Sequence, residues 1–299
     1  MIQEVITRDG FQIEPNFIDT REKIRIINRL SELGLSKIEV TSFVSPKAIP
    51  QLKDANDVVN SITRNPDISY AALVANKKGA ERALDCSIDE INLVMSVSET
   101  HNLANVKRTN EDSMNTFQEI MKSVSNTKTT INGTLATAFG CPFEGEISEE
   151  RVLSFIDRYL ELGMDSITLA DTTGMAHPKQ VKELGSEIVK RYPKLPITLH
   201  FHNTRGMGLA NVLAGISAGI VRYDASLSGL GGCPFAPGAT GNICTEDVVH
   251  MLDVMGYETG VDLDGLINLS KEIPNIVGHE VPGQIIKAGK INDLHSVKS

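Results

Sequence analysis

Short apolar segments alternate with longer amphipathic segments along the whole chain. Eight of the short segments are rich in β-branched and other apolar residues, which is typical of strands buried on both faces of a parallel sheet. They lie at residues 2–6, 37–41, 69–74, 90–95, 130–137, 166–170, 197–201 and 223–227. The pattern therefore predicts eight strands, each separated from the next by enough chain for a helix.

The segments between these strands show helical periodicity. In the first of them, apolar residues recur at every third position from Ile24 to Leu33, after a capping Asp19 and before Gly34. Alternating strands and helices imply parallel strands joined by right-handed crossovers. Eight such units in roughly 250 residues favour an α/β fold of the closed (β/α)8 TIM barrel type. The alternative, an open doubly wound sheet, is less favoured because no glycine-rich dinucleotide fingerprint follows the first strand.

The domain organisation is expected to be simple. No proline-, glycine- or serine-rich linker and no low-complexity tract divides the sequence. We expect one domain over residues 1–299, with the barrel core at residues 1–260. Residues 261–299 would add C-terminal helices and a tail to the barrel.

Composition narrows the classes of function. The chain has 299 residues and a net charge of −9, which argues against a nucleic-acid-binding surface. No apolar run approaches the roughly 20 residues that a membrane span needs, and the N-terminal residues do not resemble a targeting leader. We therefore expect a cytoplasmic protein with no nucleic-acid or membrane partner, whose four cysteines are reduced thiols.

Polar residues follow several of the predicted strands, at the end of a barrel where active sites form. His200 and His202 are two positions apart on a predicted strand, so both side chains point to one face. Asp9 follows the first strand and supplies a carboxylate. Two imidazoles and a carboxylate suit a catalytic Mg²⁺ or Mn²⁺, although these residue types also accept Zn²⁺ or Fe²⁺. The alternatives are solvated histidines and a simple turn at Asp9-Gly10.

Two further features could supply catalytic groups. Arg8 adjoins the carboxylate of Asp9 and could stabilise a developing oxyanion. The segment 229–242 is rich in glycine and proline and carries Cys233. Such a loop can act as a mobile lid whose thiol transfers a proton, whereas the alternative is a flexible surface loop with an incidental cysteine.

Taken together, these motifs resemble the 3-hydroxy-3-methylglutaryl-CoA (HMG-CoA) lyase family over nearly the whole chain. The most specific segments are residues 8–12, 39–47, 200–202 and 231–242. The resemblance implies cleavage of a 3-hydroxyacyl-CoA to acetyl-CoA and a 3-oxo acid, which is acetoacetate for the family's own substrate. It also implies an acyl-CoA as the small-molecule partner and a divalent cation as the cofactor.

The resemblance also assigns roles to individual residues. Asp9, His200 and His202 would bind the cation, and Asn242 would complete the set of ligands. Arg8 would stabilise the enolate of the departing acetyl-CoA, and Cys233 would take part in proton transfer. The positions of Glu39 and Glu246 match family residues that support the site.

Some residues depart from the family pattern, and other functions remain open. Thr7, Ile13 and Asn203 differ from the residues usual in the family, so the acyl group could be a close analogue. The alternatives are a Claisen-condensing synthase of the same barrel group, a 4-hydroxy-2-oxo acid aldolase, and a non-catalytic barrel that keeps a metal site. Extra C-terminal helices would also be compatible with a homodimer.

Overall fold

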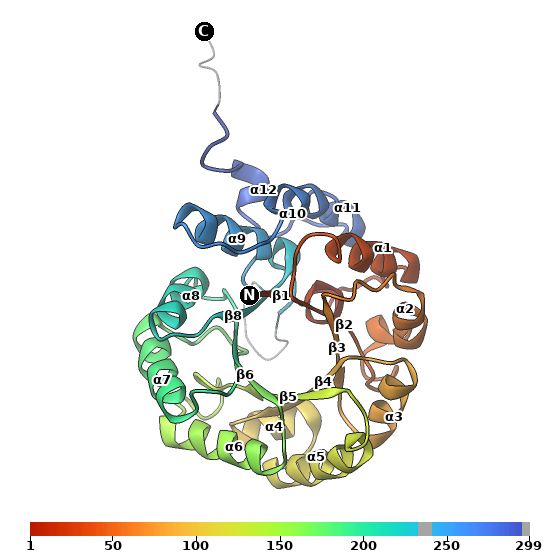
Figure 1. The fold of residues 1–299 in the computed structure, drawn as a ribbon, viewed down its shortest axis with the longest axis vertical. Coiled ribbons are helices and arrows are strands. Elements are labelled where there is room, and N and C mark those ends of the chain that lie inside the picture. The colour runs from red at the N-terminus through yellow and green to blue at the C-terminus, as the bar shows by residue number, and fades with distance from the viewer. Residues whose placement is uncertain (233–240, 295–299) are drawn as a thin grey trace.

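A computed structural model describes residues 1–232 and 241–294 of the chain. Eight parallel strands form a closed barrel in which each strand pairs with its neighbours in sequence, and β8 closes the ring against β1 (Figure 1). The strands are β1 (Ile2–Glu4), β2 (Lys37–Ser42), β3 (Ser69–Val74), β4 (Glu90–Ser96), β5 (Thr130–Ala136), β6 (Ser166–Asp171), β7 (Ile197–Phe201) and β8 (Arg222–Ala225). The predicted (β/α)8 barrel is therefore confirmed.

Helices surround this barrel and cover its outer surface (Figure 1). The helices in the described part of the chain are α1 (Thr20–Leu30), α2 (Ala55–Ser61), α3 (Lys77–Asp85), α4 (Glu99–Val106), α5 (Asn110–Val124), α6 (Glu149–Glu161), α7 (Pro178–Arg191), α8 (Gly208–Ser217), α9 (Thr245–Val254), α10 (Leu263–Ser270), α11 (Ile273–Val277) and α12 (Ile285–Ala288). The predicted cap Asp19 accepts a hydrogen bond from the Arg21 amide at the start of α1. None of the described helices is long and apolar enough to cross a membrane.

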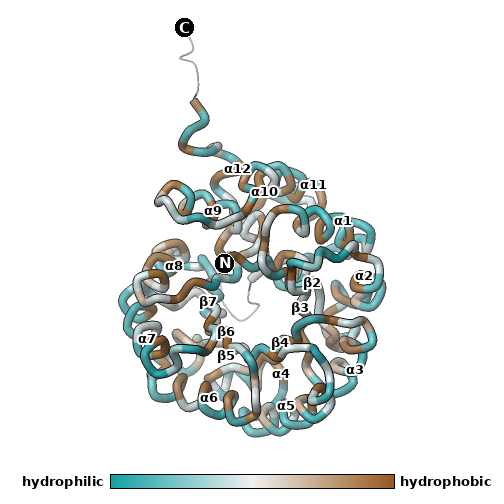
Figure 2. Tube along the Cα trace, viewed as in Figure 1, coloured by the Kyte–Doolittle hydropathy of each residue, from teal (hydrophilic) through white to brown (hydrophobic). Residues whose placement is uncertain are grey.

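The apolar core lies between the outer faces of the strands and the helices. Hydrophobic and hydrophilic residues alternate along the helices, as amphipathic packing on a barrel requires (Figure 2). Packing is tight at Gly133 on β5, where a Cβ atom would lie 2.3 Å from Cδ2 of Tyr159 on α6. Glycine is therefore needed there for the close approach of α6 to the barrel.

The C-terminal helices pack together on one side of the barrel (Figure 1). Helix α10 contacts both α9 and α1, so it links the end of the chain to the first crossover. In addition, the His279 Nε2 atom lies 2.8 Å from Glu14 Oε2, in the segment that follows β1. These contacts place the C-terminal segment beside the β1–α1 connection.

The first and last strands are shorter than predicted, and Glu4 explains both differences. Its fully buried Oε1 atom accepts hydrogen bonds from the backbone amides of Val5, Ile6 and Leu227, at 2.8–3.0 Å. The Ile6 and Leu227 amides are therefore unavailable to a strand ladder, while the Val5 amide also donates to the Ala225 carbonyl at 3.0 Å. β1 ends at Glu4 instead of residue 6, and β8 ends at Ala225 instead of residue 227. The chain after Val5 turns into a π-helical segment, Ile6–Gly10, which presents the Arg8-Asp9 pair.

Candidate functional site

Three predicted ligand residues converge at the C-terminal end of the barrel. Asp9 comes from the turn after β1, whereas His200 is on β7 and His202 directly follows that strand. The two Nε2 atoms are 3.2 Å apart, and they lie 3.9 Å and 3.8 Å from Oδ2 of Asp9. One ligand atom from each residue lies within 4.8 Å of the others, which makes these residues a candidate cation site.

Asn242 lies beside this cluster, where the resemblance placed a fourth ligand. Its Nδ2 atom donates to Asp9 Oδ2 at 2.7 Å and to the Leu230 carbonyl at 2.9 Å. A β-bridge between Asn242 and His202 fixes the backbone. Gly231 also approaches closely, because a Cβ there would lie 2.5 Å from Asn242 Nδ2, and its φ is +108°. Only glycine fits this contact without strain.

Arg8 is held between two carboxylates at the same end of the barrel. Its Nη1 atom donates to Asp9 Oδ1 at 2.5 Å, and its Nε atom donates to Glu39 Oε2. The other oxygen of Glu39 accepts from Nδ2 of Asn92, on β4, at 2.7 Å. The sequence did not identify Asn92, because only the closed barrel brings its side chain within reach of Glu39, two strands away. The guanidinium therefore has a fixed orientation beside the candidate cation site.

The charges of this cluster stabilise one another. Burial opposes ionisation of Asp9, but Arg8 and the two histidines hold the pKa of its carboxyl group below its usual range. Burial would lower the pKa of the Arg8 guanidinium, yet Glu39 and Asp9 raise it above its ordinary value. A carboxylate and a guanidinium thus stay charged side by side in a buried position.

The two histidines differ in their surroundings. Burial and, next in size, the neighbouring His200 together lower the pKa of His202 to about 4, so His202 is neutral at pH 7. For His200, burial also acts to lower the pKa, but a hydrogen bond to Asp224 raises it overall. Its Nδ1 atom lies 3.2 Å from Asp224 Oδ2. Asp224, on β8, was not among the predicted site residues.

The residues present fit a divalent cation. A carboxylate oxygen and two imidazole nitrogens form a mixed donor set that Mg²⁺, Mn²⁺ and their neighbours accept. The side-chain Oδ1 of Asn242 is buried, and within residues 1–232 and 241–294 it has no hydrogen-bond partner. A cation among these groups would give that oxygen a role if the amide turned by a half rotation.

Asp171, at the C-terminal end of β6, is a further candidate, whose place after a predicted strand was visible in the sequence but to which no role was assigned. Its Oδ1 atom accepts from the Met175 amide at 2.7 Å, while its buried Oδ2 is unpaired in the described part of the structure. Burial raises the pKa of this carboxyl group to about 6, although His200 and Arg205 act in the opposite direction. A carboxyl group that titrates near neutrality can donate or accept a proton.

The remaining residues named from the sequence are not among the candidate cation ligands. Cys233 and most of its loop fall outside the described residues, so its expected role stays a prediction. Glu246 lies on α9 and accepts from the Ser228 amide at 3.1 Å and from Ser270 Oγ at 2.5 Å. These bonds hold the segment after β8 in place. Asn203 accepts from the Gly208 amide at 3.0 Å, at the start of α8.

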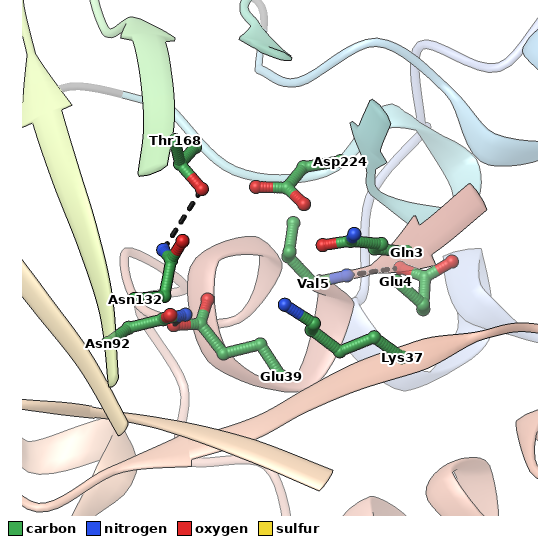
Figure 3. Close-up of a pocket in the computed structure, with 9 residues that line it drawn as sticks. All are labelled: Gln3, Glu4, Val5, Lys37, Glu39, Asn92, Asn132, Thr168 and Asp224. Atoms are coloured by element: carbon green, nitrogen blue, oxygen red, sulfur yellow. Dashed lines mark hydrogen bonds between the residues drawn. The ribbon is translucent and has the colours of Figure 1, made fainter. Parts of the chain in front are cut away.

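A small polar cavity lies inside the barrel, at the level of Glu39, Asn92 and Asp224. Figure 3 shows these side chains around it, together with Lys37, whose ammonium group pairs with Glu90. The cavity has a volume of about 10 Å³, close to the space that one water molecule needs. The barrel interior beneath the candidate site is therefore polar.

Comparisons with known proteins identify the family of this chain. A family model described as HMGL-like matches residues 1–273. A hydroxymethylglutaryl-CoA lyase of Bacillus subtilis is 42% identical over 289 residues, which cover 97% of each chain. An (R)-citramalyl-CoA lyase of Chloroflexus aurantiacus is 38% identical over 300 residues, which cover 97% of this chain and 95% of that relative.

A solved structure is also very similar. It is an HMG-CoA lyase from Acinetobacter baumannii in complex with coenzyme A and 3-methylmalate. It matches with a TM-score of 0.96 and 54% identity, covering 100% of this chain and 97% of that chain. The resemblance seen in the sequence is confirmed, and the chain belongs to the HMGL-like family.

Proposed function

We propose that this protein is a divalent-cation-dependent carbon–carbon lyase that cleaves HMG-CoA, or a close 3-hydroxyacyl-CoA analogue, to acetyl-CoA and a 3-oxo acid. For HMG-CoA the 3-oxo acid is acetoacetate. The observation that carries the proposal is the cluster of Asp9, His200 and His202 with Arg8 fixed beside it. Full-length similarity to hydroxymethylglutaryl-CoA lyases supports the same reaction.

The reaction is a retro-Claisen cleavage. The 3-hydroxyl group loses its proton, the C2–C3 bond breaks, and C3 becomes a ketone carbonyl. The bonding electrons pass to the thioester fragment as an enolate, which takes a proton at C2 to give acetyl-CoA. A divalent cation, when bound by Asp9, His200 and His202, would lower the pKa of the substrate hydroxyl.

Arg8 is placed to act on the enolate. A guanidinium has five N–H groups, and Glu39 and Asp9 each use one in this structure, so three remain for substrate. The guanidinium is already oriented and charged before the reaction begins. It would therefore stabilise the enolate oxygen more strongly than the thioester carbonyl of the ground state, which is how a fixed charge raises the rate of the chemical step.

Proton transfer needs a separate group. The unpaired Oδ2 of Asp171 and its pKa of about 6 suit acceptance of the hydroxyl proton. We keep Cys233 as the group that protonates the enolate carbon. The residue at the end of β6 would thus remove the hydroxyl proton, and the residue in the loop after β8 would supply a proton to the enolate.

The test is a product assay with purified protein. Incubation with HMG-CoA and Mg²⁺ or Mn²⁺ should yield equal amounts of acetoacetate and acetyl-CoA, and chelation should stop the reaction. (R)-Citramalyl-CoA in a parallel reaction tests the acyl group, because one relative is named for it. Cleavage of neither thioester with either ion, together with CoA release from acetyl-CoA and a 2-oxo acid, would overturn the proposal in favour of a synthase.

A further inference from the structure

We propose that Asp224 is a positioning residue that orients His200 and fixes which of its ring nitrogens faces the cation. This inference rests on the proposed function only in that a divalent cation binds at Asp9, His200 and His202. Asp224 is not within the cluster of candidate ligands. Its Oδ2 atom lies 3.2 Å from the far ring nitrogen of His200, Nδ1.

The barrel holds this contact in place. His200 and Asp224 are paired residues on the adjacent parallel strands β7 and β8. Both side chains are nearly buried, with side-chain exposures of 8% for His200 and 14% for Asp224. A carboxylate on a rigid strand holds the orientation of a neighbouring histidine more tightly than a group on a loop does.

The contact determines the tautomer of a neutral His200. An ionised carboxylate only accepts hydrogen bonds, so the imidazole proton must be on Nδ1 to pair with it. The Nε2 atom then carries the lone pair, and it faces Nε2 of His202 at 3.2 Å and Oδ2 of Asp9 at 3.9 Å. A ring nitrogen that binds a cation needs that lone pair, and a second hydrogen bond at the other nitrogen is the usual way to secure it.

Without Asp224, a competing arrangement becomes available. His200 could carry its proton on Nε2 and direct it toward Asp9 or His202, which would remove the lone pair from the site. His202 offers no alternative anchor, because its buried Nδ1 has no hydrogen-bond partner among the described residues. The orientation of the histidine pair therefore depends on the Asp224 contact.

The cavity below the site explains why truncation would be informative. Asp224 lines this cavity with Thr168 and Asn132, as Figure 3 shows. Replacing Asp224 by alanine enlarges a polar space that already has room for about one water molecule. Water can fill the space, but it can donate as well as accept a hydrogen bond, so it does not impose one tautomer on His200.

The experiment measures cation affinity and the tautomer directly. Free Mn²⁺ is determined by electron paramagnetic resonance in titrations of the parent protein, Asp224→Ala and Asp224→Asn. Loss of a partner of a metal-binding histidine costs about 10- to 100-fold in affinity, so Asp224→Ala should weaken Mn²⁺ binding by that factor. Asp224→Asn should fall between the two, because its amide oxygen still accepts a hydrogen bond but carries no charge.

Thr168→Val is the matched control. Thr168 lines the same cavity and accepts a hydrogen bond from Asn132 at 3.0 Å, but in the described part of the structure it forms no hydrogen bond with His200. This variant should bind Mn²⁺ within about twofold of the parent. Thermal unfolding of the cation-free proteins checks that each variant is folded before its affinity is compared.

A second readout needs neither cation nor activity. Long-range ¹H–¹⁵N spectra of histidine-labelled, cation-free protein, recorded at alkaline pH so that the ring is neutral, should show His200 protonated at Nδ1 in the parent, and a mixed population in Asp224→Ala. A parent tautomer protonated at Nε2, or a folded Asp224→Ala that binds Mn²⁺ as tightly as the parent, would overturn the inference. Cleavage of HMG-CoA by the parent is scored separately, so failure of the proposed reaction is distinguished from failure of this role.

Discussion

Replacement of Arg8 by glutamine should reduce turnover far more than substrate binding. The side chain is shorter and neutral, so the three N–H groups that remain for substrate are lost together with the positive charge. Removing a single preorganised donor from an oxyanion site typically lowers kcat by about 10²- to 10³-fold, or about 2.7–4 kcal/mol. We expect a decrease of at least that size, because a buried full charge is removed as well.

The local structure should survive this change. Glu39 keeps its hydrogen bond from Asn92 at 2.7 Å, and in the cation-free protein Asp9 keeps the one from Asn242 at 2.7 Å. Glutamine can also donate to one of the two carboxylates. The candidate cation ligands thus retain most of their support, which separates an effect on chemistry from an effect on cation binding.

The assay is steady-state acetoacetate formation from HMG-CoA at saturating Mn²⁺, with Mn²⁺ affinity measured for each protein. Arg191→Gln is a matched control, because Arg191 pairs with Asp157 on the outside of the barrel. It should leave kcat and KM unchanged. An Arg8→Gln enzyme whose KM rises while kcat stays intact would refute the reasoning, since Arg8 would then bind substrate and transition state equally.

Three further substitutions test other parts of the structure. Asn92→Ala removes the 2.7 Å hydrogen bond to Glu39 and should lower kcat by about tenfold, because a freed carboxylate orients Arg8 less well; an unchanged kcat would contradict this role. Asp171 has its pKa raised to about 6 from an ordinary 3.8, so its contribution to stability is complete below about pH 4 and is lost as the pH rises through 6. Asp171→Asn should therefore stabilise the cation-free protein by about 3 kcal/mol at pH 7 and hardly at all below about pH 4, and equal effects in urea unfolding at both pH values would exclude this linkage. Gly133→Ala would place its Cβ 2.3 Å from the ring of Tyr159 and should cost about 2–3 kcal/mol in the same assay, whereas a neutral result would mean that α6 can move away.

The overall fold was predictable because its signal is distributed along the chain. Each strand is a short apolar segment of the length that a buried parallel strand requires, and eight of them alternate with helical patterns. The ends of β1 and β8 were not predictable in the same way. They depend on the Glu4 carboxylate, which accepts hydrogen bonds from the backbone amides of residues 5, 6 and 227. The periodicity of the sequence contains no information on such a long-range contact.

The candidate site was partly predictable for a related reason. Residues at the C-terminal ends of barrel strands converge, so Asp9 could be grouped with His200 and His202 from the strand assignment alone. Asn92 and Asp224 could not, because each lies within a strand and acquires its role from a contact that the folded barrel creates, Asn92 with Glu39 and Asp224 with His200. Asn203 adjoins the histidines in sequence, and its side chain accepts from the Gly208 amide at the start of α8.

The central claim is that Asp9, His200 and His202 hold one divalent cation. The most direct measurement is anomalous X-ray diffraction from crystals of the intact protein grown with Mn²⁺. We predict one strong peak at about 2.0–2.3 Å from a carboxylate oxygen of Asp9 and from both histidine Nε2 atoms, with Asn242 Oδ1 turned toward it. No peak between these side chains at saturating Mn²⁺, or a peak held by other residues, would contradict the account.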